Sequence, residues 1–327
     1  MKYQPNRVLR VVAALTLCTL VASCDELPDD PEVPDRLRVA LVTSRADTDD
    51  GPRWFIYEID QEGTVTEIVT STEPISFARY TSFRGTQGSI AYLEEDGDLV
   101  VRHLASGSTR TITGPFGRPR FSGDGSLIAY TRAIEGEDGA GREQVFVLDS
   151  ISDDLSQVTL DECTDTASPP NPCAFESIRP VFGEDNELYM VRFLRTNEGA
   201  EQVSISAFTT SQLEQRYIVQ PIGGRTLYPN SVFEGSLVVS YAEQEGTSNE
   251  VLGFYAINVR TGQWIENQIQ MRDASYCFDA TIMGVQGTEL RVVDVAGDDV
   301  DRVQLPAAYG TDILSVECSV QSRDIVR

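Results

Sequence analysis

The chain has 327 residues, 41% of them hydrophobic, and its 51 acidic and 26 basic side chains give a formal net charge of −25 at pH 7. This length and apolar content allow a globular fold with a sizeable core. The excess of acids leads us to expect no nucleic-acid partner, because phosphate binding requires clusters of Lys and Arg. One histidine and no CxxC spacing lead us to expect no metal site and no cofactor.

The amino terminus is typical of a secretory signal. Three basic residues precede an apolar run at residues 11–22, which contains no acid and is too short for a membrane-spanning helix of about 20 residues. The letters VASC at residues 21–24 resemble the lipobox of bacterial lipoproteins, in which small residues precede a cysteine that is acylated. We therefore expect residues 1–23 to be removed and Cys24 to carry lipid such as palmitate. The alternative is an ordinary cysteine after a conventional cleavage site.

Residues 24–36 are predicted to form a solvated tether after the lipidated cysteine. They contain the acidic, proline-rich stretch DELPDDPEVPD, a composition that does not build a packed core. Loss of the signal removes three positive charges and changes the formal net charge from −25 to about −28. We expect a protein anchored to a membrane of the bacterial envelope, facing the periplasm or the exterior. The choice between inner and outer membrane stays open.

Four cysteines remain after the signal and the lipid site: Cys163, Cys173, Cys277 and Cys318. An even number in an oxidising compartment favours two disulfides, for which three pairings are possible. The first two bracket the proline-containing loop TDTASPPNP, so we pair Cys163 with Cys173 and Cys277 with Cys318. A zinc site is the rival interpretation, but the spacing and the near absence of histidine disfavour it.

A repeat dominates the rest of the chain. Residues 118–159 contain RPRFSGDGSLIAYT, a polar Gly-rich stretch, QVFVLD ending at Asp149, and a further strand ending in VT. This segment resembles a blade of the TolB-type β-propeller family. The letters IRPVFGEDNELYMV repeat its first part, with the proline, the phenylalanine and the turn in the same places.

Other segments follow the same plan and can be aligned on the position of Asp149. The aligned positions are Asp60, His103, Asp149, Ala207, Asn258 and Asp294, at intervals of 36 to 58 residues. Four-stranded blades repeat about every 40 to 50 residues, so residues 37–327 are predicted to form an all-β, six-bladed propeller. An unclosed β-sandwich and a seven-bladed ring are the alternatives.

The two ends of this predicted propeller complement each other. The first blade lacks an innermost strand, and DILSVECS near the carboxyl end has the pattern of one. We expect this strand to join the first blade and close the ring, which removes open sheet edges. Closure would also place Cys277 and Cys318 on inner strands of adjacent blades.

Candidates for chemistry are few. His103 is expected to be a surface turn residue, and no GxSxG nucleophile motif is present, so we predict no catalytic residue. Two acidic turns could offer oxygen ligands to calcium, although solvated turns are the simpler interpretation. These turns contain Asp47, Asp49 and Asp50 in one case and Asp298, Asp299 and Asp301 in the other. Trp54 and Trp264 are expected to pack between blades, a sugar platform being the alternative.

The resemblance to the TolB-type family implies a docking platform for other envelope proteins. We therefore expect a non-catalytic lipoprotein whose partners are membrane lipid, through Cys24, and an envelope protein. A metal-dependent hydrolase or lactonase of the six-bladed kind is the alternative, and a carbohydrate-binding propeller is a third. Fold carries less information about function than a site does, so the choice depends on the channel.

Overall fold

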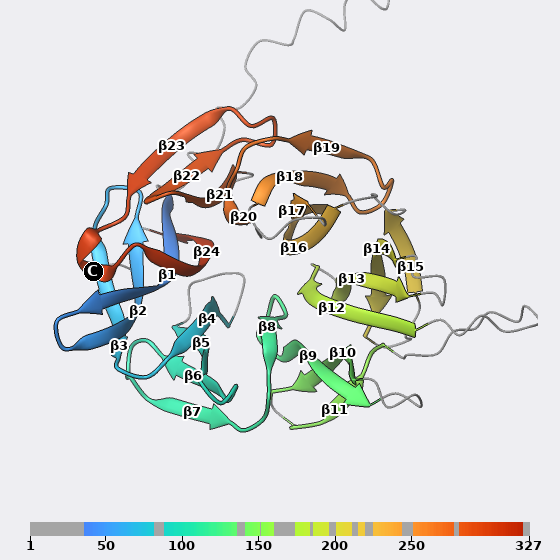
Figure 1. Cartoon of the computed structure of the whole chain (residues 1–327), viewed down its shortest axis with the longest axis horizontal. Helices are drawn as coiled ribbons and strands as arrows, with labels where there is room; N and C mark the ends of the chain where they lie inside the picture. Colours follow the sequence, from blue (N-terminus) through green and yellow to red (C-terminus); the bar gives the residue numbers. More distant parts are fainter. Residues whose placement is uncertain are drawn as a thin grey trace, which may run out of the picture. The chain divides into compact units, whose positions relative to one another are not determined.

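A computed structural model describes residues 36–81, 88–135, 141–150, 152–159, 174–183, 186–195, 201–210, 215–219, 225–243, 251–277 and 281–322. These residues form six four-stranded antiparallel sheets arranged around a centre as the blades of a propeller (Figure 1). The predicted six-bladed all-β fold is thus confirmed. Within the described ranges the helical element is one short turn, η1 (Ala307–Tyr309), and no helix has the length and apolar character needed to cross a membrane.

Each blade consists of four strands that follow one another from the centre of the ring outward. Blade 1 contains β24 (Asp312–Ser322), β1 (Arg36–Thr48), β2 (Gly51–Asp60) and β3 (Val65–Ser71). Blade 2 contains β4 (Ile75–Tyr80), β5 (Ser89–Glu94), β6 (Leu99–His103) and β7 (Thr109–Ile112). Blade 3 contains β8 (Gly117–Phe121), β9 (Leu127–Glu135), β10 (Gly141–Asp149) and β11 (Leu155–Gln157).

The second half of the ring follows the same order. Blade 4 contains β12 (Ala174–Phe182), β13 (Glu187–Arg195), β14 (Glu201–Thr209) and β15 (Gln215–Val219). Blade 5 contains β16 (Arg225–Phe233), β17 (Ser236–Glu243), β18 (Val251–Asn258) and β19 (Trp264–Asn267). Blade 6 contains β20 (Arg272–Cys277), β21 (Thr281–Gln286), β22 (Glu289–Val293) and β23 (Asp299–Gln304).

The ring closes through the carboxyl-terminal strand, as the sequence predicted. β24 lies next to β1 in the first blade, where the Ser315 hydroxyl donates to Thr43 Oγ1 over 3.1 Å. A disulfide joins Cys277 of β20 to Cys318 of β24, with Cα atoms 5.0 Å apart. The predicted partners Cys163 and Cys173, like Cys24 and the predicted signal at residues 1–23, lie outside the described residues.

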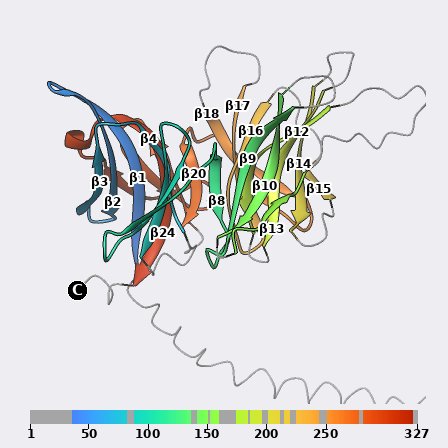
Figure 2. The ribbon, with the colours of Figure 1, turned by 90° about the horizontal axis from the view of Figure 1, so that it is seen from below.

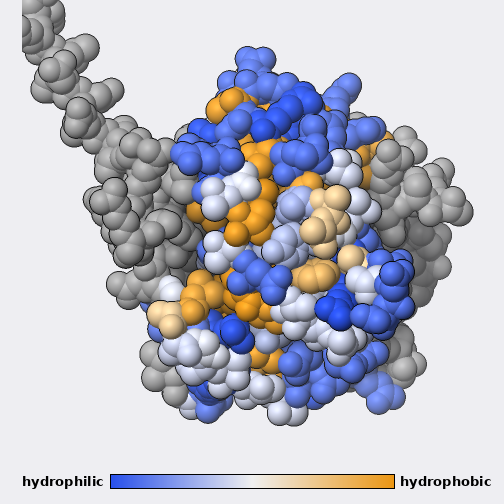
Figure 3. Space-filling model, turned by 90° about the vertical axis from the view of Figure 1, so that its left-hand side faces the viewer, coloured by the Kyte–Doolittle hydropathy of each residue, from blue (hydrophilic) through white to orange (hydrophobic). Residues whose placement is uncertain are grey.

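The core lies between the blades. The second strand of blade 1 buries four consecutive residues, Val39 to Val42, because neighbouring sheets cover both of its faces. The largest fully buried side chains include Tyr57 and Tyr255. Figure 2 shows the sheets standing side by side around the centre, and Figure 3 shows one outer face, where hydrophilic side chains predominate with hydrophobic groups between them.

Polar residues cap the turns after the third strands, as expected. One carboxylate oxygen of Asp60 accepts hydrogen bonds from the backbone amides of Glu62 and Thr64, over 2.9 and 2.8 Å. Asn258 and Asp294 act similarly in blades 5 and 6. In blade 4 the predicted alignment is wrong by two residues, because β14 continues past Ala207 to Thr209, which pairs with the first residue of β13. The proposed equivalence relied on apolar letters, which cannot mark a strand's end.

A backbone irregularity recurs in the innermost strands. The register of β4, β8, β12 and β20 against the second strand shifts by one residue. The residues within these shifts have left-handed φ values of 46° to 58° and are Phe77, Arg118, Arg179 and Asp273. Such bulges re-aim side chains, and non-glycine residues with positive φ are costly enough to cluster at functional sites.

Candidate functional site: an arginine-lined central channel

The innermost strands of all six blades line a chain of cavities at the centre of the ring. An inner cavity of about 40 Å³, a neck of about 10 Å³ and a wider mouth of about 270 Å³ share Asn230 and Asp273 in their walls. We refer to these three neighbouring spaces together as the channel. The bulged strands β8, β12 and β20 contribute to its neck and mouth.

The channel has the opposite charge to the rest of the chain. The described residues that line it include five arginines, Arg79, Arg118, Arg120, Arg179 and Arg272, and two carboxylates, Asp273 and Glu317. In a chain with 51 acids and 26 bases this local excess of cations is unexpected from composition. Positive charge in a concave, partly desolvated site favours anions strongly.

Two arginines at the mouth are held by aromatic rings. The guanidinium carbon of Arg179 lies 3.6 Å from the ring centroid of Tyr228, and that of Arg118 lies 5.0 Å from the centroid of Phe77. Cation–π contacts fix the plane of a guanidinium group without occupying its N–H donors. Arg118 is therefore positioned and still able to bind an acceptor. Arg179 also forms a side-chain hydrogen bond with Tyr228, and its Nη1 stays without a partner among the described residues.

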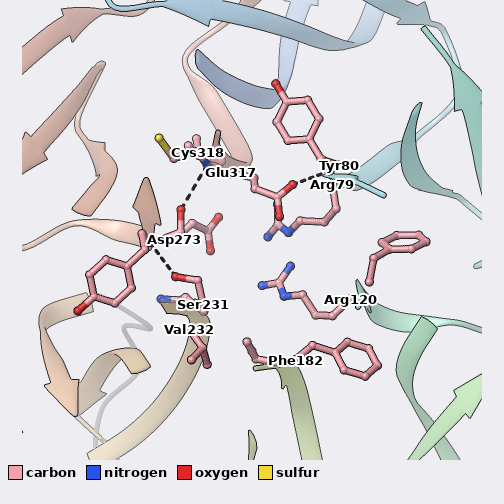
Figure 4. A pocket seen from close by; sticks show the side chains of 15 residues that line it. Arg79, Tyr80, Arg120, Phe182, Ser231, Val232, Asp273, Glu317 and Cys318 are labelled. Carbon is pink, nitrogen blue, oxygen red and sulfur yellow. Dashed lines mark hydrogen bonds between the residues drawn. The ribbon is translucent and has the colours of Figure 1, made fainter. Parts of the chain in front are cut away.

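The inner cavity holds a second pair of arginines. In Figure 4 the guanidinium groups of Arg79 and Arg120 point into the cavity toward each other, with the Glu317 carboxylate beside Arg79. One Glu317 oxygen accepts a hydrogen bond from the backbone amide of Tyr80 over 2.5 Å. Ser231 and Ser275 make the corresponding links between the next blades, by accepting from the amides of Tyr276 and Cys318.

The enclosure of these groups disfavours their charges. The pKa of Arg120 is lowered to about 9, mainly by burial. The positive charge of Arg79 lowers this pKa as well, and its effect is larger than the opposing effect of the Glu317 carboxylate. Burial and the charge of Arg118 lower the pKa of Arg179 to about 10, and burial also lowers that of Arg118. All three stay protonated at neutral pH. Burial raises the pKa of Glu317, against the opposing effect of Arg79 and Arg120.

Much of the hydrogen-bonding capacity of the channel is not used by the protein. Arg79 donates to the carbonyl of Ala78 over 2.9 Å, whereas Arg118 and Arg120 make no side-chain hydrogen bond to another described residue. Nη1 of Arg179 is buried without a hydrogen-bond partner among these residues. A buried donor without an acceptor costs free energy, which an acceptor supplied by a ligand would recover.

The acidic turns singled out from the sequence are paired with arginines. Asp299 accepts from Arg291 Nε over 2.6 Å and from Arg302 Nη2 over 2.8 Å, and these hydrogen bonds lower its pKa. Asp47 accepts from Arg45 Nη2 over 2.7 Å. Among the described residues no group of three or more His, Cys, Asp and Glu side chains is placed to hold a metal ion.

His103 lies in an exposed turn, where its Nδ1 is 3.2 Å from the backbone amide of Ser106. Trp264 is 45% exposed and contacts the edge of Tyr255, with ring centroids 5.0 Å apart. Neither residue belongs to the channel. The sequence did show one signal for the channel itself: Arg followed by Pro recurs at Arg118 and Arg179, at the same place in two copies of the repeat.

No protein-family profile matches this chain, and no curated protein matches it either. Among solved structures, the tricorn protease is similar over 86% of this chain and 30% of its own, with 13% identity and a TM-score of 0.51. A prolyl endopeptidase matches over 82% of this chain and 43% of its own, with 14% identity and a TM-score of 0.46. The chain thus spans less than half of either protein.

A third solved structure, oligogalacturonate lyase from Vibrio parahaemolyticus, covers 81% of this chain and 79% of its own, with 11% identity and a TM-score of 0.46. At such identities similarity concerns the fold alone. The six sheets of the closed ring, together with the structural similarity to the tricorn protease, place this chain among the six-bladed β-propellers.

Proposed function

We propose that this propeller is a binding protein for a small anionic molecule, which it holds in the arginine-lined channel. The observation that carries the proposal is the set of guanidinium groups whose donors have no acceptor among the described residues. Planar guanidinium groups bind carboxylate, sulfate and phosphate through paired N–H donors. The mouth of about 270 Å³ is close to the lower limit of about 300 Å³ for small-molecule pockets, so the ligand is small.

The test is calorimetric titration of the purified full chain with sulfate and with succinate. The variant Arg118→Gln removes one mouth cation that no described acceptor holds, and Arg260→Gln, an exposed turn residue outside the channel, is its matched control. One lost charged hydrogen bond contributes about 1.5 kcal/mol or more, so Kd should rise at least about tenfold in Arg118→Gln and stay unchanged in Arg260→Gln. Absence of binding, or equal binding by both variants, contradicts the proposal.

We infer that the propeller carries out this function on a membrane of the bacterial envelope, held by lipid on Cys24. The support is the signal-like amino terminus and the VASC sequence before an acidic tether. Stable anchoring by lipid usually needs two signals, such as two acyl chains. In cells, Cys24→Ala should move the protein from the membrane to the soluble fraction and remove the acyl mass from its amino-terminal peptide.

Docking of an envelope protein is the second candidate function. Two neighbouring side chains on the outermost strand β19, Trp264 and Ile265, are 45% and 54% exposed, and Val300 on β23 is 46% exposed. Trp is frequent in the centres of protein interfaces. Crosslinking in intact cells should capture a partner with the parent chain and lose it with Trp264→Ser/Ile265→Ser. Recovery of the parent only as a free monomer contradicts this second role.

A further inference from the structure

The channel mouth contains an acceptor opposite its cations, and this bears on the class of ligand. Asp273 lies in a bulge of β20, with a φ of 52°, at the place in its blade that Arg118 and Arg179 occupy in theirs. Its carboxylate contributes to the wall of the mouth, the neck and the inner cavity. It makes no hydrogen bond or ion pair with another side chain in the described ranges.

A second acceptor, on Asn230, lines the same three spaces as Asp273. Nδ2 of Asn230 donates to the Ser240 hydroxyl over 2.8 Å, which leaves the amide oxygen as an acceptor on this wall. The mouth therefore combines arginine donors with two oxygen acceptors, Asp273 and Asn230. A simple anion satisfies the arginines and leaves both acceptors without a donor.

We propose that the ligand is a hydroxy acid, whose carboxylate binds Arg118 and Arg179 and whose hydroxyl groups donate to Asp273 and Asn230. This inference rests on the proposed anion-binding function and adds the ligand class. An ammonium group could also donate to Asp273, but five arginines against two carboxylates make the channel net positive, so an amino acid is disfavoured. A hydroxyl group donates without adding charge.

Four dicarboxylic acids test this with the anionic groups held constant. Succinate has no hydroxyl group, malate has one, tartrate has two, and aspartate has an ammonium group in place of the hydroxyl. For the full chain at pH 7.5, with both malate enantiomers measured, we expect the better malate enantiomer and tartrate to bind about tenfold more tightly than succinate, a difference of about 1.4 kcal/mol. Aspartate should bind more weakly than malate.

The variant Asp273→Asn assigns the preference to its residue. Asn tolerates the left-handed backbone at least as well as Asp, so the substitution preserves the bulge. We expect the ratio of the malate and succinate affinities to fall from about ten toward one, while the exposed turn variant Asp49→Asn, with the same loss of charge, keeps the parent's ratio. The titration of the parent stands without the variant if Asp273→Asn does not fold.

The possible outcomes separate the two proposals. If sulfate and succinate bind but malate and tartrate show no advantage, the hydroxy-acid inference is wrong and the anion-binding function stands. A malate preference that survives Asp273→Asn also overturns the role given to Asp273. If none of the anions binds, both proposals fail.

Discussion

Removing the disulfide that joins the last blade to the first should weaken the whole ring. The double variant Cys277→Ala/Cys318→Ala deletes the covalent link, and alanine is preferred to serine because both cysteines are buried and a serine hydroxyl there would have to be desolvated. The bond closes a loop with a sequence separation of 41 residues. In the chain-entropy treatment of the unfolded state this corresponds to about 4 kcal/mol at 25 °C.

The assay is equilibrium unfolding of the full chain in denaturant, followed by tryptophan fluorescence. The two tryptophans lie in blade 1 and blade 5, so agreement between fluorescence and circular dichroism checks that the ring unfolds in one transition. A loss of about 4 kcal/mol should lower the melting temperature by roughly 6 to 7 °C in a protein of this size. Substitution is better than reductant for this purpose, because reductant would also open the predicted bond between Cys163 and Cys173.

A change of less than about 1 kcal/mol would refute this reasoning. It would mean that the unfolded chain gains little freedom from the missing bond, or that β24 contributes little to cooperative unfolding. Mass spectrometry of the non-reduced parent is the control, since it shows whether the peptides containing Cys277 and Cys318 are linked in the protein under test.

Three further predictions concern single residues. Because burial raises the pKa of Glu317 above its ordinary value of 4.5, acidification should neutralise this carboxylate and increase the affinity of the channel for sulfate. Glu317→Gln should bind more tightly at pH 7.5 and lose this pH dependence, and a parent whose affinity stays flat as the pH falls from 7.5 to 4.5 contradicts this. Gly310→Ala brings Cβ into overlap with the Arg45 carbonyl at a φ of +86°, so it should destabilise by well over the roughly 1 to 2 kcal/mol expected of Gly63→Ala, which has a similar φ and no atom within 4 Å; equal denaturation midpoints would exclude the clash. Asp60→Ala removes the acceptor for two turn amides and should lower the free energy of unfolding by about 1 kcal/mol in the same assay, against no change for Asp49→Ala.

The repeat made the fold predictable because each blade uses the same local signals. The letters RPRFSGDGSLIAYT set a strand, a turn and a second strand, and the carboxyl-terminal DILSVECS matched the gap in the first blade. Polar turn caps such as Asp149 fixed the strand ends. In the fourth blade the alignment relied on apolar letters and placed the end of the strand at Ala207 instead of Thr209.

The channel was harder to predict because its residues are far apart in sequence and come from strands that look apolar. Arg79 and Arg120 share one cavity only because the ring places β4 and β8 side by side. The sequence also does not predict the bulges, because no single residue type occupies the bulged position, which holds Phe77, Arg118, Arg179 and Asp273. The recurring Arg-Pro pair was the available sequence signal for the channel. Hydrophobic periodicity does not distinguish this pair from other positions in a strand.

The strand that closes the ring, β24, also contributes to the proposed anion site. Cys318 is bonded to blade 6, and Glu317, the residue before it, lies among the channel arginines. If the anion site exists only in the closed ring, a bound anion stabilises closure by about 2.7 kcal/mol at 100 times its Kd. Sulfate should then restore more than half of the stability lost in the disulfide variant. Adding Arg118→Gln tests the cause: sulfate also stabilises proteins by exclusion from their surface, so an undiminished gain there would mean that the channel is not responsible.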